Sequence, residues 1–218
     1  MDAARIARLL EPFLAGDQEL EASDLEVIST YIDILLRWNA RINLTSIRDP
    51  ERIVTRHFGE SLFAARQLFP KDSTPRASSA VVANVADLGS GAGFPGIPIK
   101  IWAPEISMTL IESSHKKAAF LREVARALIL TDIDVQNVRA ESMTGSRFEV
   151  VTLRAVERFE SVLPIAIRLV APAGRLALLI GSSQFDRARS LAPDLTWLRP
   201  LAIPRSESRI LAVGQLTT

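Results

Sequence analysis

The segment from Val81 to Pro98 constrains the fold of this chain more than any other stretch of its sequence. It opens with an apolar run typical of a buried strand and closes where an apolar helical pattern begins. Between them, glycines stand at three alternating positions: Gly89, Gly91 and Gly93. A strand, a glycine turn and a helix in succession can bring backbone N–H groups close to a ligand, because glycine lacks a Cβ atom and accepts positive φ. We therefore predict an α/β fold with a ligand site at this turn.

The spacing within the turn distinguishes two kinds of ligand site. A dinucleotide fingerprint G-x-G-x-x-G would require glycine where the chain has Phe94. The observed G-x-G-x-G, with Asp87 two residues before the first glycine, instead resembles motif I of class I S-adenosylmethionine-dependent methyltransferases. That resemblance implies that Asp87, Gly89, Gly91 and Gly93 bind the cofactor. The alternative is a tight turn without a ligand, which rarely needs three alternating glycines.

Hydrophobic periodicity divides the chain into three parts. Residues 1–70 show helical spacing and are interpreted as an N-terminal helical extension. Residues 71–80 are rich in Pro, Ser and charge and are interpreted as a linker, and residues 81–218 form the methyltransferase-like domain. Capping residues mark two helix starts in the extension: Ser23 with Glu26 as a capping box, and Asp49 before Pro50.

From residue 81 onward, apolar β-type runs alternate with helical patterns. The expected strands are 81–88, 107–111, 133–138, 148–153, 175–180, 196–203 and 209–213, and the expected helices are about 95–103, 115–129, 158–170 and 184–191. This alternation predicts a Rossmann-like, doubly wound, mostly parallel seven-stranded sheet with helices on both faces. The last two runs lie close together in the chain, so we expect them to form an antiparallel hairpin.

Composition excludes several classes of site. The chain of 218 residues contains no cysteine and only two histidines, which excludes disulfides, Cys-ligated zinc and a cysteine nucleophile; no metal site is expected. A net charge of +1 does not by itself indicate a nucleic-acid-binding protein, so any basic surface that binds nucleic acid must be local. The N-terminus lacks a signal-peptide core, and no apolar run approaches the ~18 residues of a membrane span. We expect a cytoplasmic protein without a membrane partner.

Charged residues follow two of the expected strands at the edge where ligands of such sheets bind. Glu112 lies 21 residues after Gly91 and can accept both ribose hydroxyls of an adenosine, or cap the following helix. Lys116, in the first turn of that helix, either contacts phosphate or is solvated. Arg154 closes the fourth strand and should face the cofactor or the acceptor, which makes it the candidate catalytic residue; the alternative is a surface arginine.

Several motifs together narrow the family. They are Asp87–Pro98, Trp38-Asn39, Asn43-Leu44-Thr45, Arg56–Leu62, Glu112–Leu121, Arg139–Glu141 and Arg154-Ala155. This combination resembles the RsmG (GidB) family of bacterial 16S ribosomal RNA guanine-N7 methyltransferases, over nearly the whole chain. The glycine motif alone would indicate only the superfamily.

The resemblance implies an activity and its partners. Methyl would pass from S-adenosylmethionine to N7 of one guanine in the decoding region of 16S rRNA, within the small ribosomal subunit or a precursor, and the enzyme is expected to be a monomer. The implied contacts are Gly89, Phe94, Ala140, Glu141 and Arg154 for the cofactor, and Arg139, Arg154 and Arg209 for the RNA. One departure matters, because Ile180 stands where the family often carries a lysine, and a cation near the acceptor is then missing.

A local excess of basic residues supports an RNA surface. Residues 37–76 include eight Lys or Arg and four Asp or Glu, from which we predict that Arg52 and Arg56 contact RNA. A solvated helical face is the alternative. Trp38 is interpreted as a core residue rather than a stacking platform, and His57 as a structural hydrogen-bonding residue rather than a base.

Absent motifs indicate which atom is methylated. Methylation of pyrimidine C5 usually requires a cysteine nucleophile. Methylation of an exocyclic amine commonly uses an Asn/Asp-Pro-Pro-aromatic motif, where this chain reads Leu153-Arg154-Ala155-Val156. Guanine N7 carries an in-plane lone pair and no proton, so its attack needs orientation and electrostatics but no general base. The predicted product is therefore N7-methylguanosine.

Three other functions stay open on the sequence alone. One is a class I methyltransferase with a small-molecule or protein substrate. Another is a nicotinamide oxidoreductase, against which Phe94 argues. The third is a non-catalytic ribosome-associated protein, which only Ile180 supports.

Overall fold

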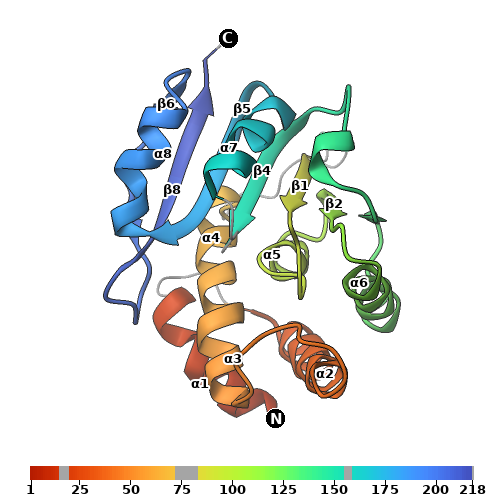
Figure 1. Ribbon diagram of the computed structural model, residues 1–218. Coiled ribbons are helices and arrows are strands. Elements are labelled where there is room, and N and C mark those ends of the chain that lie inside the picture. Colours follow the sequence, from red (N-terminus) through yellow and green to blue (C-terminus); the bar gives the residue numbers. More distant parts are fainter. Residues whose placement is uncertain (15–19, 72–82, 155–158, 218) are drawn as a thin grey trace.

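The centre of the molecule is an eight-stranded sheet (Figure 1). The computed structural model describes residues 1–14, 20–71, 83–154 and 159–217. The strand order is β3-β2-β1-β4-β5-β8-β6, and β7 also pairs with β8. Strands β3, β2, β1, β4 and β5 run parallel, whereas β8 is antiparallel to β5, β6 and β7. The strands are β1 Asn84–Leu88, β2 Ser107–Ile111, β3 Ile133–Gln136, β4 Phe148–Arg154, β5 Val170–Gly181, β6 Leu195–Trp197, β7 Leu201–Ala202 and β8 Arg209–Leu216.

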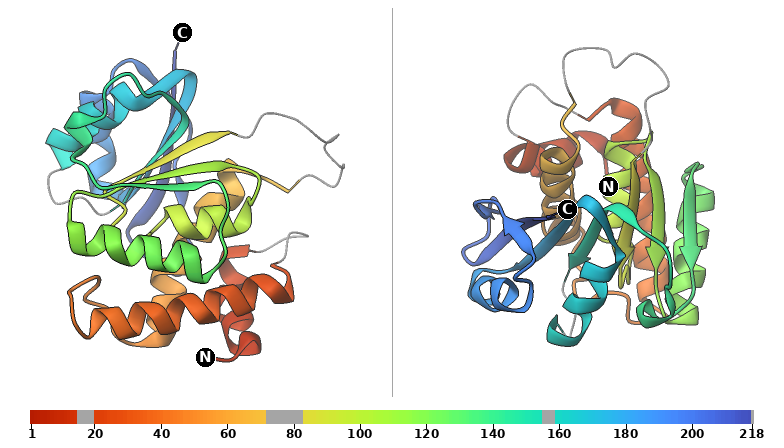
Figure 2. Two further views of the ribbon diagram at one scale, coloured as in Figure 1. Left: turned by 90° about the vertical axis from the view of Figure 1, so that its right-hand side faces the viewer. Right: turned by 90° about the horizontal axis from the view of Figure 1, so that it is seen from above.

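Helices cover both faces of the sheet, as the two views of Figure 2 show. Helices α1 to α6 lie on one side and α7 and α8 on the other. The helices are α1 Ala3–Leu14, α2 Ala22–Asn39, α3 Pro50–Ile53, the π-helical segment η1 Val54–Gly59, α4 Glu60–Leu68, α5 Gly96–Trp102, α6 His115–Ala127, the 3₁₀ turn η2 Ala140–Ser142, α7 Phe159–Leu169, the 3₁₀ turn η3 Ser182–Gln184 and α8 Phe185–Leu191. None of the described helices is long and apolar enough to cross a membrane.

Two hydrophobic cores follow from the alternation of side chains along the strands. Val85 and Leu179 point into the core shared with α1 to α6. Their neighbours Ala86 and Ile180 point into the core shared with α7 and α8. A sheet buried on both faces explains why its strands read as nearly continuous apolar runs. The predicted doubly wound fold is confirmed.

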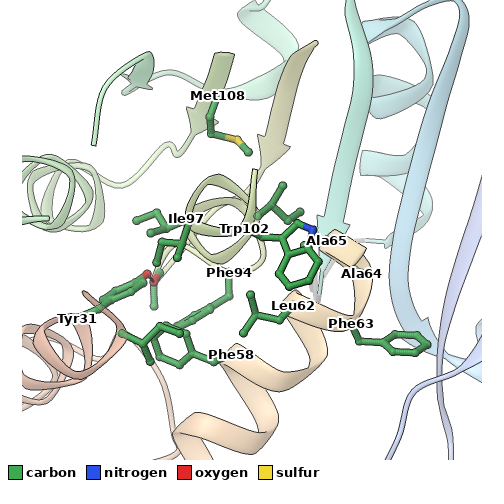
Figure 3. Close-up of a cluster of buried hydrophobic side chains, with 14 of the residues drawn as sticks. Tyr31, Phe58, Leu62, Phe63, Ala64, Ala65, Phe94, Ile97, Trp102 and Met108 are labelled. Carbon is green, nitrogen blue, oxygen red and sulfur yellow. Dashed lines mark hydrogen bonds between the residues drawn. The ribbon is translucent and has the colours of Figure 1, made fainter. Parts of the chain in front are cut away.

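The N-terminal helices belong to the first core. In Figure 3, Tyr31 of α2, Phe58 of η1 and Phe94 of the glycine turn lie together beside Ile97 of α5. The rings of Tyr31 and Phe94 are nearly parallel, with their centroids 5.4 Å apart. The ring of Phe58 meets that of Phe94 edge-on, with a centroid distance of 5.1 Å. The helices of residues 1–70 therefore pack directly against the element that follows β1.

Two details differ from the sequence predictions. Helix α2 starts at Ala22 with Glu21 as its N-cap, and the Asp24 carboxylate accepts the Glu21 N–H at 3.0 Å in a capping box. The predicted capping pair of Ser23 and Glu26 is wrong. The run 196–203 forms the two short strands β6 and β7, which raises the strand count from seven to eight. Most of the predicted linker lies outside the described residues. The Asp49 cap of α3 is confirmed, because its side chain accepts the Arg52 N–H at 2.8 Å.

Candidate active site

The glycine turn after β1 adopts the backbone that only glycine accepts easily. The φ angles of Gly89, Gly91 and Gly93 are 70°, 57° and 84°. A Cβ atom at Gly93 would lie 2.3 Å from the Tyr31 hydroxyl, so this glycine is also required by packing. A Cβ at Gly91 would meet only the Gly89 carbonyl oxygen, at 3.8 Å. The backbone at Gly91 is thus open to close approach from outside.

Asp87 is buried at the end of β1 and binds the residues that follow the glycine turn. Its side chain is 1% exposed, its Oδ1 accepts the Thr152 hydroxyl at 2.7 Å, and its Oδ2 accepts the Gly96 N–H at 3.2 Å. Burial raises the pKa of Asp87 to about 6, although these hydrogen bonds and the charge of Arg154 oppose the rise. One carboxylate oxygen therefore binds the start of α5 and the other binds β4. The predicted cofactor contact of Asp87 stays a prediction.

Glu112 joins the end of β2 to the glycine turn. It is 7% exposed, its Oε2 accepts the Gly91 N–H at 2.9 Å, and its Oε1 accepts the Ser114 N–H at 2.7 Å. The structure thus brings Glu112 and Gly91 together and gives Glu112 the alternative role at the start of α6, while its predicted ribose contact stays a prediction. A carboxylate has about four lone-pair sites, so these two bonds leave capacity for hydroxyl donors.

Arg154 ends β4 and reaches toward η1 and α4. Its Nη2 donates to the Arg56 carbonyl at 2.5 Å, to His57 Nδ1 at 3.2 Å and to Glu60 Oε2 at 3.2 Å. The side chain is 8% exposed, and its buried Nε has no hydrogen-bond partner among the described residues. Burial lowers the pKa of Arg154 to about 10, so the guanidinium stays charged near neutral pH.

His57 is a neutral structural residue, as predicted. Because a guanidinium can only donate, Nδ1 must accept from Arg154, and the ring proton sits on Nε2. Nε2 then donates to the Thr45 hydroxyl at 2.8 Å. Burial, followed by the charges of Arg154, Arg56 and Arg209, lowers the pKa of His57 to about 3. The ring stacks on Phe94 with centroids 4.7 Å apart, which joins η1 to the glycine turn.

Glu60 is the residue that sequence reasoning missed. Its side chain is 1% exposed and forms ion pairs with three arginines: Arg209 Nε at 2.9 Å, Arg154 Nη2 at 3.2 Å and Arg56 Nη1 at 3.3 Å. In the sequence it lies within the family motif Arg56–Leu62 and counts as an acidic residue in a basic stretch, but no role at the site was predicted for it. Two features of the sequence could have indicated a buried ion pair. Glu60 stands on the apolar face of a helix, where a solvated carboxylate is not expected, and it follows Arg56 by four residues.

Two residues predicted to contact RNA are bound to Glu60, and their RNA contacts stay predictions. Arg209 is 18% exposed and bound to Glu60, and Arg56 is 38% exposed and bound to the same carboxylate. Neither is a freely solvated phosphate ligand. Arg52, Lys116 and Arg139 are exposed, and their RNA contacts stay predictions.

The remaining predicted residues lie around the same edge of the sheet. The Phe94 side chain is 7% exposed and packed between Tyr31 and His57, so a cofactor contact at this position would use its backbone. Ala140 and the exposed Glu141 form the turn η2, which follows β3. Within the described residues, no cluster of His, Cys, Asp or Glu could hold a metal ion.

Ile180 is a packing residue. It is 4% exposed and belongs to the core beneath α7 and α8. A lysine at this position would bring a charged group into an apolar core, which is costly. Packing in the core therefore explains an isoleucine at this position. Ile180 no longer supports the hypothesis of a non-catalytic ribosome-associated protein.

Comparisons with known proteins identify the family. The family model described as "GidB: rRNA small subunit methyltransferase G" matches residues 24–207. The chain is 34% identical over 206 residues to ribosomal RNA small subunit methyltransferase G of Xylella fastidiosa (strain 9a5c), covering 90% of this chain and 92% of that protein. It is 38% identical to the protein of the same name in Roseiflexus castenholzii, covering 89% of this chain and 84% of that protein.

Solved structures agree on the fold. The ribosomal protein L11 methylase of Lactobacillus delbrueckii subsp. bulgaricus matches with a TM-score of 0.59 at 15% identity, covering 75% of this chain and 79% of that one. TYW2 of P. horikoshii, in complex with MeSAdo, matches with a TM-score of 0.58 at 14% identity, covering 74% and 63%. With its glycine turn, Glu112 and Arg154 at one edge of this sheet, the chain belongs to the rRNA small subunit methyltransferase G family.

Proposed function

We propose that this chain methylates N7 of a guanine in the decoding region of 16S rRNA, with S-adenosylmethionine as methyl donor. The substrate would be the small ribosomal subunit or a precursor, and the enzyme would act as a cytoplasmic monomer. Family membership supports rRNA as the methyl acceptor. The observation that carries the cofactor is the contact of Glu112 Oε2 with the Gly91 N–H at 2.9 Å, which sets an acidic side chain beside an open glycine turn.

The residues present fit this cofactor. The backbone at Gly91 is open to close approach, and the buried Nε of Arg154 lacks a partner among the described residues. S-adenosylmethionine supplies an electrophilic methyl group on a sulfonium. In our proposal the glycine turn approaches its methionine part, Glu112 accepts from its ribose hydroxyls, and the backbone of Ala140 and Glu141 binds the adenine edge.

The side chains also fit attack by guanine N7. That atom needs no general base, because its lone pair lies in the plane of the ring and it carries no proton. His57 uses Nδ1 and Nε2 in hydrogen bonds within the chain, and Asp87 is buried. Arg154 keeps its charge and would orient a phosphate group or guanine O6. Its guanidinium would then lie away from the five-membered ring of the guanine, which becomes positive when N7 is methylated. We therefore expect little pH dependence of the methyl-transfer step near neutrality.

The product can be tested chemically. Purified small subunits, and separately protein-free 16S rRNA, are incubated with the enzyme and labelled S-adenosylmethionine. Borohydride reduction followed by aniline cleaves RNA at N7-methylguanosine, so we expect one new cleavage site in the decoding region. Methylated RNA that resists cleavage, or a methyl group on C5 or an exocyclic nitrogen, would overturn the proposed product. Labelling of small molecules or protein instead of RNA would favour the alternative class I methyltransferase.

A further inference from the structure

One buried carboxylate holds together three guanidinium groups from distant parts of the chain. Arg56 comes from η1, Arg154 from the carboxyl end of β4 and Arg209 from the first residue of β8. Their shortest distances to Glu60 are 3.3, 3.2 and 2.9 Å. Counting full charges, three arginines and one glutamate leave this cluster at +2. Arg209 pairs with Gly181 at the end of β5, so the cluster lies at the ligand-binding edge of the sheet.

Mutual repulsion would separate these guanidiniums without the carboxylate. Like charges a few ångströms apart repel strongly in a partly buried site, where water screens them less than in solution. Each arginine is flexible, and its orientation therefore depends on what it is bound to. Arg154 is bound through Nη2 alone among its described bonds, which leaves its buried Nε unpartnered. The cluster is thus a set of cations with fixed positions and unused donor capacity.

The backbone around Glu60 is built to place it there. The π-helical segment η1 ends at Gly59, where a Cβ atom would lie 2.6 Å from the Phe13 ring of α1. Two carbonyl oxygens of η1 accept bonds from outside the helix ladder: Arg56 from Arg154 Nη2, and His57 from the Ser61 hydroxyl at 2.6 Å. Single-turn π segments inside helices are frequent at functional sites.

We propose that Glu60 is a positioning residue for methyl transfer, which holds Arg154 and Arg209 in the orientation that the RNA meets beside the cofactor. The inference rests on the proposed function. It does not require Glu60 to touch the RNA or the cofactor. It requires the carboxylate to act through the arginines, so its removal must lower turnover more than it lowers RNA affinity.

The test compares Glu60→Gln and Glu60→Asp in the full-length chain. Labelled methyl transfer to small subunits is measured at saturating concentrations of both substrates, per folded molecule. We expect Glu60→Gln to lower kcat by at least ~10-fold, the low end for loss of a charged partner in the transition state. RNA affinity should be unchanged or higher, since the cluster gains one positive charge. Glu60→Asp keeps the charge and should retain more turnover than Glu60→Gln.

A charge-balanced variant separates positioning from simple neutralisation. Removing one member of a buried ion pair leaves an uncompensated buried charge and can strongly destabilise a protein, so Glu60→Gln alone can fail to fold. The double variant Glu60→Gln/Arg56→Gln keeps the cluster at +2 and removes the most exposed of the three arginines. We expect it to fold and to stay well below the turnover of Arg56→Gln alone. Equal turnover in these two variants would show that Glu60 does not position the remaining arginines. Wild-type turnover in the double variant, whose cluster has the same net charge as the wild type, would show that Glu60 only balances charge. Either result would overturn the proposal.

A matched control is Glu160→Gln, the same substitution in the exposed ion pair with Arg187, which should leave turnover unchanged. The proposed function fails separately, if the wild-type chain does not methylate 16S rRNA at N7. The Glu60 comparison then still holds for any RNA position that the wild type modifies.

Discussion

Among single residues, Arg154 has three hydrogen-bond partners at the site, because its Nη2 atom contacts both η1 and α4. We expect Arg154→Ala to lower kcat by at least ~10-fold, since a charged hydrogen-bonding partner is lost at the place where we propose that cofactor and acceptor meet. Initial rates on small subunits, corrected for the folded fraction, measure the effect. Arg187→Ala, which removes an exposed arginine from a surface ion pair, is the control and should be neutral. A wild-type rate in Arg154→Ala would remove this residue from the site.

His57 gives the stability of the protein a specific pH dependence. The folded state keeps its ring neutral down to a pKa of about 3, whereas the unfolded chain takes up the proton near 6.5. Between these values the unfolded state binds more protons, so the stabilisation is complete above pH 6.5 and is lost as the pH falls toward 3. The loss is about 1.4 kcal/mol for each pH unit.

We therefore expect the free energy of unfolding of His57→Gln to fall less steeply on acidification than that of the wild type. Urea unfolding between about pH 7 and about pH 5 measures both slopes. Asp87 acts in the opposite direction, because its pKa is raised to about 6 and the folded state then holds the extra proton. For that reason the comparison is made between variant and wild type. Parallel slopes would contradict the neutral, buried state of His57.

At the scale of elements, Gly91 and Gly93 of the glycine turn are constrained for different reasons: Gly91 faces open space and Gly93 packs against Tyr31. Gly91→Val should abolish binding of S-adenosylmethionine in calorimetry, because the new side chain enters the open approach to the turn and a branched residue is strained at φ 57°. Gly145→Val is a matched control, since Gly145 also has positive φ and nothing lies within 4 Å of its Cβ position. Unchanged cofactor affinity in a folded Gly91→Val variant would exclude this turn as the cofactor site.

Gly93 is constrained from inside. We expect Gly93→Ala to weaken cofactor binding by displacing Tyr31, whose hydroxyl would lie 2.3 Å from the added methyl group. Tyr31→Phe removes that oxygen, so the double variant should recover part of the affinity lost in Gly93→Ala. The affinities of both single variants and the double variant form a complete cycle. Additive losses would show that the two positions do not interact.

The elements that the sequence predicted are those with a local signal. The glycine turn, the strands of the parallel sheet and the Asp49 cap depend on residues adjacent in the chain, and Glu112 follows from a fixed distance along one β-α-β unit. The Glu60 cluster depends on side chains 94 and 149 positions away from Glu60, so no periodicity reveals it. The π-helical segment η1 was not foreseen either, because its residues have ordinary helical spacing.

At the scale of the whole molecule, RNA binding should depend on exposed basic residues of the N-terminal helices. Arg52 is exposed on α3, whereas Arg56 is partly buried and paired with Glu60, so Arg52 is the cleaner test of that surface. We expect Arg52→Glu to weaken RNA binding, to reduce the slope of log affinity against log salt concentration, and to leave cofactor affinity unchanged. Arg199→Glu, the same reversal in the exposed segment between β6 and β7, is the control. Identical RNA affinity for both variants across the salt series would make Arg52 part of a solvated face.

Tyr31 is the single tyrosine of the chain, and its hydroxyl donates to the Ala92 carbonyl at 2.5 Å, inside the glycine turn. Burial, with the nearby charge of Asp87, raises the pKa of Tyr31 well above its usual value, so the hydroxyl stays a donor. Biosynthetic incorporation of fluorotyrosine would consequently give one ¹⁹F resonance for the whole protein, without any substitution. The fluorine would lie on a helix of the N-terminal part, and its chemical shift would report on the glycine turn. One spectrum would therefore show whether RNA binding to the helices changes the environment of that turn.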